Sequence, residues 1–152
     1  MADTLIVAVS GLDVAHGLAF YKGDLYVADT HQVLRYRDAD GDHVYEQSDV
    51  LVEQLPARGQ HSTRTIVFDE VNEMLYVSVG STCDLCRDED PERATVLEFN
   101  ADGSGRRIFA RGLRNAIGLA LHPVTNELWA NNNGQEPQDG ADPLDESETA
   151  EW

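Results

Sequence analysis

The chain is 152 residues long and strongly acidic, with 28 Asp and Glu residues against 11 Lys and Arg residues and a formal net charge of −17. Its hydrophobic content of 41% is enough to fill the core of one ordinary domain. An acidic surface repels phosphate backbones and anionic lipids, which excludes nucleic acids and membrane surfaces as expected partners. A carboxylate-rich surface with one lysine, Lys22, is typical of proteins that work in concentrated salt, where counterions screen the repulsion.

No apolar stretch approaches the roughly 20 residues that span a bilayer. The short apolar run 5–9 follows Asp3 and no basic residue, which is unlike a secretory signal. We therefore expect the chain, as given, to stay in the cytoplasm; a longer parent protein could be exported.

The clearest feature of the sequence is an internal repeat, in which an apolar strand, a turn and a Leu-aromatic strand recur three times. The marker leucines Leu25, Leu75 and Leu128 give a period of about 50 residues, which fits a β-propeller blade of four short antiparallel strands. The expected strand pairs are 17–20 with 24–27, 65–68 with 74–77, and 118–121 with 127–130.

Period-2 alternation continues between the markers and predicts third and fourth strands at 32–36, 49–52, 95–99 and 107–110. No segment has the apolar stripe of an amphipathic helix, so the sequence predicts an all-β chain that forms about two and a half to three blades of a propeller. The expected divisions are a leading strand in 1–10, blade one at 11–56, blade two at 57–110, the first half of blade three at 111–131, and an acidic loop or tail at 132–152.

An arc of two and a half blades leaves strand edges open, whereas a closed ring covers them. The chain is therefore expected either to be a piece of a longer polypeptide or to find its missing half in a second chain, most simply as a homodimer.

Four blocks of sequence follow one another at regular separations: Gly59 to Thr65, Leu75 to Ser81, Arg111 to Leu119, and Pro123 to Trp129. Together with the C-x-x-C and the turn 100–105, they resemble the glucose/sorbosone dehydrogenase family, specifically its sorbosone-dehydrogenase-like branch. The resemblance implies a six-bladed propeller that binds pyrroloquinoline quinone (PQQ) and calcium over its central channel. It also implies a dehydrogenase that oxidises an aldose or an aldosone by hydride transfer to the quinone.

By this resemblance, His61 matches the general base that takes the proton from the anomeric hydroxyl of the sugar. Arg114 and Asn115 match the pair that holds the quinone oxygens and the developing negative charge. The calcium is expected on main-chain oxygens of the loop after the Leu-Trp strand, with Gly134 and Gln135 as candidate donors. This loop departs from the pattern usual in the family.

The repeat gives an independent reason to group these residues. Asp13, His61 and Arg114 each stand seven residues before the apolar residue that closes a first strand. Equal offsets mean equivalent places in successive blades, and first strands begin beside the propeller axis. We therefore expect the three side chains at one opening, where a histidine and an arginine suit proton abstraction and oxyanion stabilisation.

Each candidate also has a simpler interpretation. His61 can be a polar residue that caps the start of a strand, and Arg114 can form a salt bridge with one of the many carboxylates. Arg64 is a further candidate for the anionic groups of the cofactor, but pairing with Asp69 or Glu70 is the favoured interpretation.

Cys83 and Cys86 form a single C-x-x-C, which is half of a zinc site at best because the chain has no other cysteine. Arg87 follows where a c-type haem attachment requires histidine. The pair is interpreted as a loop disulfide or as two thiols.

The stretch 38–42 places Asp38, Asp40 and Asp42 at alternating positions. This pattern suits a hard cation such as calcium, and it is equally an ordinary acidic hairpin turn without the twelfth-position glutamate of an EF-hand.

The predicted function is a PQQ-dependent sugar dehydrogenase whose substrate pocket needs residues from blades that this chain lacks. The alternative is a non-catalytic half-propeller module that pairs with itself or with another chain. A propeller hydrolase of the gluconolactonase kind would need several acidic metal ligands facing the axis, and Asp13 is the one candidate that the repeat places there.

Overall fold

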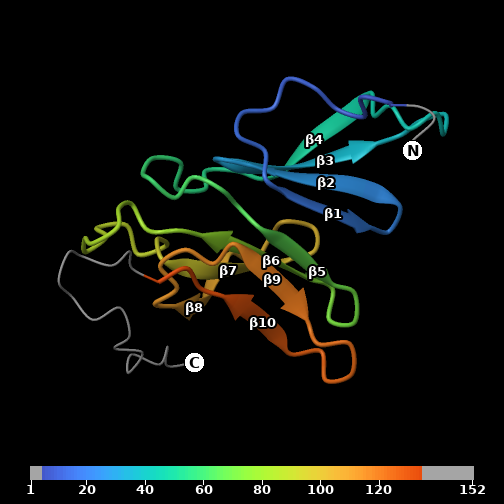
Figure 1. Cartoon of the computed structure of the whole chain (residues 1–152). Helices are drawn as coiled ribbons and strands as arrows, with labels where there is room; N and C mark the ends of the chain where they lie inside the picture. Colours follow the sequence, from blue (N-terminus) through green and yellow to red (C-terminus); the bar gives the residue numbers. More distant parts are fainter. Residues whose placement is uncertain (1–4, 135–152) are drawn as a thin grey trace.

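In a computed structural model, residues 5–134 are described and form ten β-strands and no helix (Figure 1). The strands are β1 (Gly17–Tyr21), β2 (Asp24–Asp29), β3 (Gln32–Arg37), β4 (Gln47–Val52), β5 (Ile66–Asp69), β6 (Met74–Val79), β7 (Thr95–Asn100), β8 (Arg107–Arg111), β9 (Gly118–Leu121) and β10 (Leu128–Asn131). They form two antiparallel four-stranded sheets, β1-β2-β3-β4 and β5-β6-β7-β8, and one hairpin, β9-β10. The expected all-β partial propeller is confirmed. Nothing in this part of the chain is a helix long and apolar enough to cross a membrane.

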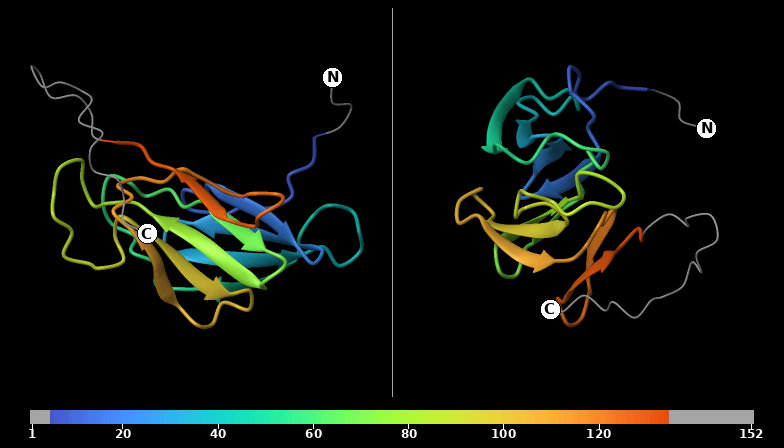
Figure 2. Two further views of the ribbon diagram at one scale, coloured as in Figure 1. Left: turned by 90° about the horizontal axis from the view of Figure 1, so that it is seen from below. Right: turned by 90° about the vertical axis from the view of Figure 1, so that its left-hand side faces the viewer.

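The first strands of the three sheets lie next to one another. β1 contacts β5, and β5 contacts β9; Figure 1 shows the three strands running in the same direction. The sheets fan out from these strands in Figure 2, as blades do around an axis. The loops that precede β1, β5 and β9 therefore lie at the same end of the arc.

The main core fills the space between the two four-stranded sheets. Tyr21 of β1 stacks on Phe68 of β5 with ring centroids 4.4 Å apart, and Leu75, Val77 and Phe99 pack beside them. β6 is buried along five of its six residues, because sheet β1–β4 covers one face of its sheet and hairpin β9-β10 covers the other. A central blade covered on both sides positions its loops more rigidly than a blade at the open end.

The leading strand expected in 1–10 is not formed in the part of this segment that the structure describes, since residues 5–10 belong to no strand. A strand needs a neighbour to pair its N–H and C=O groups, and residues 5–134 provide one main-chain bond to this segment, from Tyr45 N to Ala8 O at 3.0 Å. Leu5 and Val7 are 93% and 68% exposed, whereas Val9 packs against the cluster of Leu25, Val27 and Tyr36. The apolar run is present, but no strand among the described residues pairs with it.

The repeat shows which strand this segment corresponds to. Gly11 and Gly112 have φ angles of 78° and 79°, and they precede Leu12 and Leu113 in otherwise equivalent stretches that lead into β1 and β9. Residues 6–10 therefore occupy the place of β8, the fourth strand of a blade.

This correspondence predicts how the Leu12 amide behaves. The equivalent amides are bonded, Leu113 N to the carbonyl of Ala94 at 3.0 Å and Leu55 N to that of His31 at 2.8 Å, in each case to the residue just before a third strand. Leu12 N makes no such bond within residues 5–134. In the isolated chain we expect its amide hydrogen to exchange at least about tenfold faster than those of Leu55 and Leu113, as measured by NMR. Equal protection at all three positions would contradict the correspondence.

A buried carboxylate joins the second sheet to the hairpin. Asp69, at the end of β5, accepts hydrogen bonds from the carboxamides of Asn126 and Asn72, both at 2.7 Å, and from the main-chain N–H groups of Asn72 and Val71. Burial acts to raise the pKa of Asp69, but these hydrogen bonds to the ionised form lower it overall.

Because the folded-state pKa of Asp69 lies below the unfolded one, its contribution to stability is present above the unfolded pKa and is lost as the pH falls through the folded one. We expect the free energy of unfolding, measured by denaturant titration, to fall between about pH 5 and about pH 3 by more in the wild type than in Asp69→Asn. The variant is the control for the other carboxylates, whose mutual repulsion weakens on acidification. Parallel pH profiles would contradict this role for Asp69.

Candidate active site

His61 lies in the loop before β5, where its ring is held through one nitrogen. Nδ1 is 3.0 Å from the main-chain oxygen of Ser81 and 3.0 Å from its hydroxyl oxygen. A carbonyl oxygen can only accept a hydrogen bond, so we assign the proton of the neutral ring to Nδ1. Nε2 is then unprotonated, and it makes no hydrogen bond within residues 5–134. A half-buried imidazole in this state presents a free lone pair, as a general base requires.

Ser81, just beyond the end of β6, connects His61 to Arg114. Its side chain is buried, and its hydroxyl donates to the carbonyl of Cys83 at 2.7 Å. Its main-chain N–H donates to the carbonyl of Arg114 at 2.8 Å. The loops that hold His61 and Arg114 therefore meet at Ser81. Asp13 lies exposed in the equivalent loop before β1.

Gly80 allows both His61 and Asn115 to lie close to the backbone of residue 80. A Cβ atom at this position would collide with the Cβ of His61 and would lie 3.1 Å from Oδ1 of Asn115. The backbone of Asn115 is fixed from the loop after β10: its N–H donates to Oδ1 of Asn132 at 3.1 Å, and its carbonyl accepts from the N–H of Asn133 at 3.0 Å. Its carboxamide makes no hydrogen bond within the described chain, so its N–H groups are available to a ligand.

The guanidinium of Arg114 is largely engaged by the protein itself. Nη2 forms an ion pair with the carboxylate of Asp84, and Nε donates to the main-chain oxygen of Asp84 at 3.2 Å. Nη1 donates to the carbonyls of Asn133 at 3.0 Å and Gly134 at 2.8 Å. The salt bridge considered as the simpler interpretation is therefore formed. One of the five N–H groups remains for a ligand, and the others hold two loops together.

One of the two expected calcium donors, Gly134, fits a cation poorly in this arrangement. The carbonyl of Gly134 already accepts from a guanidinium, whose positive charge disfavours a dication on the same oxygen. Gln135 lies outside the described residues. Within 5–134, the one group of carboxylates close enough together to share a cation is in the turn 38–46, and it includes no residue of this opening.

Arg64 fits neither of its two interpretations, the contact with a cofactor and the pairing with Asp69 or Glu70. It is fully buried and donates to the carbonyls of His61 at 3.1 Å, Thr63 at 2.7 Å and Pro56. Burial, with repulsion from Arg93 as a smaller cause, lowers the pKa of Arg64 to about 10.

The pairing of Arg64 with Asp69 or Glu70 is wrong, because Arg64 precedes β5 while those carboxylates lie at and beyond its far end. At roughly 3.3 Å per residue, that separation exceeds the reach of the side chain. Because Arg64 has no exposed surface, its guanidinium cannot contact a cofactor in this arrangement.

The two cysteines form a disulfide, Cys83–Cys86, which decides between the two interpretations of the C-x-x-C. Asp84, the partner of Arg114, lies inside this four-residue loop. Gly80, Ser81 and Asp84 are not predicted as site residues from the sequence, although the first two lie in a block that carries the family resemblance.

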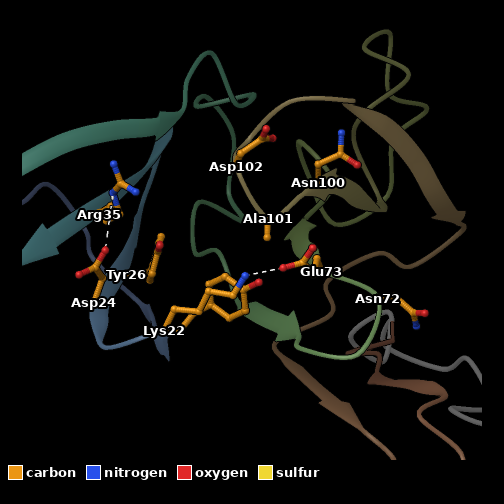
Figure 3. A pocket seen from close by; sticks show the side chains of 10 residues that line it. Lys22, Asp24, Tyr26, Arg35, Asn72, Glu73, Asn100, Ala101 and Asp102 are labelled. Atoms are coloured by element: carbon orange, nitrogen blue, oxygen red, sulfur yellow. Dashed lines mark hydrogen bonds and ion pairs between the residues drawn. The ribbon is translucent and has the colours of Figure 1, made fainter.

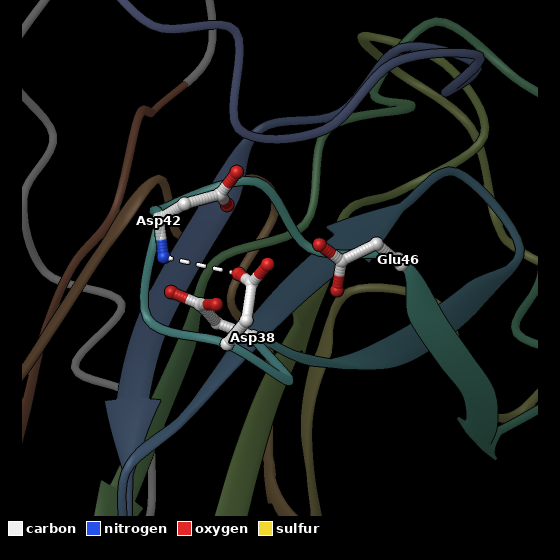
Figure 4. Close-up of side chains that lie close together, drawn as sticks. Asp38, Asp42 and Glu46 are labelled. Atoms are coloured by element: carbon white, nitrogen blue, oxygen red, sulfur yellow. Dashed lines mark hydrogen bonds between the residues drawn. The ribbon is translucent and has the colours of Figure 1, made fainter.

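The acidic turn is well formed (Figure 4). Carboxylate oxygens of Asp38, Asp40, Asp42 and Glu46 lie within 4.8 Å of one another. Several of them accept from main-chain N–H groups of the same turn, for example those of Gly41 at 2.7 Å and Val44 at 2.8 Å. These bonds are what an acidic hairpin turn makes without an ion, so both interpretations of the turn remain open.

A pocket lies at the end of the first two blades opposite to His61, among the turns that follow β1, β5 and β7. It has a volume of about 460 Å³, and the exposed ion pair of Lys22 with Glu73 joins the two blades there (Figure 3). Tyr21 extends into its wall with a buried hydroxyl that has no partner within the described residues. The face that holds His61 is thus distinct from this one.

The fold is a partial β-propeller in which His61 lies in the loop before β5, hydrogen-bonded to Ser81. The family model described as TrAA12-like matches residues 1–142, and the chain belongs to this family. The match is not specific to the sorbosone-dehydrogenase-like branch.

Solved structures with the same fold include fungal proteins. The iodide structure of the Trichoderma reesei Carbohydrate-Active Enzymes Family AA12 protein superimposes with a TM-score of 0.76 at 19% identity over 91% of this chain and 38% of that one. The calcium structure of the same protein gives 0.73 at 18% identity over 86% and 36%. The holo form of the pyranose dehydrogenase PQQ domain from Coprinopsis cinerea gives 0.75 at 17% identity over 86% and 35%.

An uncharacterized protein of Borreliella burgdorferi is 34% identical over 76 residues, which are 50% of this chain and 20% of that protein. The chain therefore spans less than two fifths of each of these relatives and neighbours.

The close approach at Gly80 predicts that Gly80→Ala displaces His61 or Asn115, because the added methyl group would collide with His61. In histidine-selective NMR spectra, we expect the His61 ring signals to shift while those of His43 stay in place. Glu70→Ala, in an exposed turn at the far end of β5, is the control and should move neither set. Unchanged His61 signals in Gly80→Ala would show that the ring is not held against this backbone.

Proposed function

We propose that this chain forms part of a PQQ-dependent sugar dehydrogenase of the glucose/sorbosone type, which oxidises an aldose or an aldosone. The observation that carries the proposal is the state of His61: Nδ1 is fixed on Ser81, and Nε2 makes no hydrogen bond within residues 5–134. The Cβ of His61 and Oδ1 of Asn115 both lie close to the backbone of Gly80. PQQ would supply the hydride acceptor. The resemblance of the sequence and the PQQ-bound Coprinopsis cinerea domain with the same fold support this cofactor.

The residues of the chain take distinct roles in this proposal. Nε2 of His61 removes the proton of the anomeric hydroxyl, and the carboxamide of Asn115 donates to an oxygen of the quinone. Arg114 contributes its remaining N–H and its positive charge, and its other bonds hold the loop 131–134 against the loop 83–86. The water-exposed side of this opening must be closed by other blades, because both ends of the arc expose apolar residues such as Phe20 and Trp129.

Calcium enters the proposal only through the resemblance and the calcium-containing neighbour. Because the carbonyl of Gly134 is engaged by Arg114, we assign no calcium step to the described residues.

The blades that complete the pocket would come from the rest of the same propeller or from a second copy of the chain. The alternative function, a non-catalytic half-propeller module, shares this need for a partner but does not need a free base. Light scattering in concentrated salt distinguishes a defined dimer from heterogeneous association.

The direct test is titration with PQQ followed by dye reduction with aldoses, using the assembled protein that contains this chain. We expect His61→Asn to lower turnover by about 10²- to 10⁴-fold, the usual contribution of a general base, with PQQ affinity little changed. Asn115→Ala should weaken PQQ binding instead. His31→Asn, an exposed histidine in blade one, is the matched control and should retain full activity. Failure of the assembled protein to bind PQQ would reject the dehydrogenase and leave the non-catalytic module.

A further inference from the structure

We propose that the Cys83–Cys86 disulfide is a redox-sensitive positioning element, which holds the His61 and Arg114 site in shape until a dithiol reductant opens it. The proposal rests on the function proposed above for what the site does, and on the contacts below for how it is held.

One set of contacts runs from the disulfide loop to His61. The carbonyl of Cys83 accepts the hydroxyl hydrogen of Ser81 at 2.7 Å. That hydroxyl oxygen therefore turns its lone pairs toward Nδ1–H of His61, which lies 3.0 Å away. Moving the carbonyl of Cys83 frees the hydroxyl of Ser81 to rotate, and His61 loses one of its two acceptors.

A second set of contacts runs from the same loop to Arg114. Asp84, between the two cysteines, provides both its carboxylate and its carbonyl to the guanidinium. The opposite edge of the guanidinium holds the carbonyls of Asn133 and Gly134. Arg114 thus links the two loops, and the contacts of its guanidinium on one side are all with Asp84 of the disulfide loop.

The backbone on the N-terminal side of the loop is anchored without the disulfide. The N–H of Ser81 donates to Arg114 O at 2.8 Å, and Thr82 is fixed through the N–H of Gln60 at 2.7 Å and the carboxylate of Asp88 at 2.8 Å. Opening the disulfide should therefore release residues 83–86 and leave β6 in place. The expected change is local to the site.

The disulfide is also reachable. Cys86 is exposed and Cys83 is half-buried. Both line a pocket of about 400 Å³ together with Asp84 and Arg114. A thiolate of the dithiol attacks one sulfur to give a mixed disulfide, and its second thiol then displaces the protein. In sum, the Cys83–Cys86 bond breaks, two protein thiols form, and the dithiol is oxidised to its own disulfide with transfer of two electrons and two protons.

The test follows hydrogen exchange at the Arg114 Nε–H, by NMR, in the oxidised chain and after addition of dithiothreitol. Loss of a hydrogen bond to a charged group predicts exchange at least about tenfold faster in the reduced chain. The amides of Leu75 and Val77 in β6 should keep their protection. Cys83→Ser combined with Cys86→Ser should behave as the reduced form, whereas Leu85→Ala, 58% exposed between the two cysteines, should behave as the oxidised one.

Unchanged protection of the Arg114 Nε–H on reduction would overturn the proposal. Loss of protection throughout β6 would overturn it as well, because the disulfide would then stabilise the whole fold rather than the site. PQQ affinity, measured in parallel on the assembled protein, should fall on reduction. Absence of PQQ binding in both redox states would reject the proposed function alone, since the exchange experiment still decides whether the disulfide positions Arg114.

Discussion

The candidate site depends on a buried serine at the end of a strand that is covered on both faces. Ser81 accepts Nδ1–H of His61 on its carbonyl, donates its N–H to the carbonyl of Arg114, and donates its hydroxyl to Cys83. Three chain segments, which precede β5, follow β6 and precede β9, thus meet on one residue. Because Ser81 is buried, breaking these bonds leaves polar groups without a partner, which favours one arrangement of the three segments.

Packing between the blades brings those segments together. β1, β5 and β9 lie side by side through the apolar layers that centre on Phe68 and Leu75 on one face and on Tyr76 and Ala110 on the other. A register slip of one residue would turn the core-facing side chains of a strand to its other face. The apolar alternation therefore fixes the register of each first strand, and the register fixes the position of the loop that precedes it.

The repeat is sufficient to predict strands β1 to β10, the open arc and the adjacency of the loops that hold His61 and Arg114, because each follows from a local pattern repeated at a fixed period. The failures concern contacts that no repeated pattern specifies. The favoured partners of Arg64, Asp69 and Glu70, lie at and beyond the far end of β5, whereas its guanidinium donates to carbonyls on the near side of this strand. Asp84 was not connected to Arg114, thirty residues later in the chain. Residues 5–10 have a strand pattern, but a strand exists only when a neighbouring strand is supplied. In the sequence, Asp84 is simply an acid between two cysteines. Its role as the partner of Arg114 is evident only from the structure, where the disulfide loop and the loop after β10 bind the same guanidinium.

The central claim is that the fold holds the ring of His61 with its proton on Nδ1 and its lone pair on Nε2. Nitrogen-15 NMR of the histidine rings in the oxidised chain, at a pH where the ring is neutral, tests this directly. The account predicts a protonated Nδ1 that couples to its hydrogen and an Nε2 signal at the shift of a bare nitrogen. A ring protonated on Nε2 would contradict it, because the lone pair on Nδ1 would then face Ser81 rather than the opening.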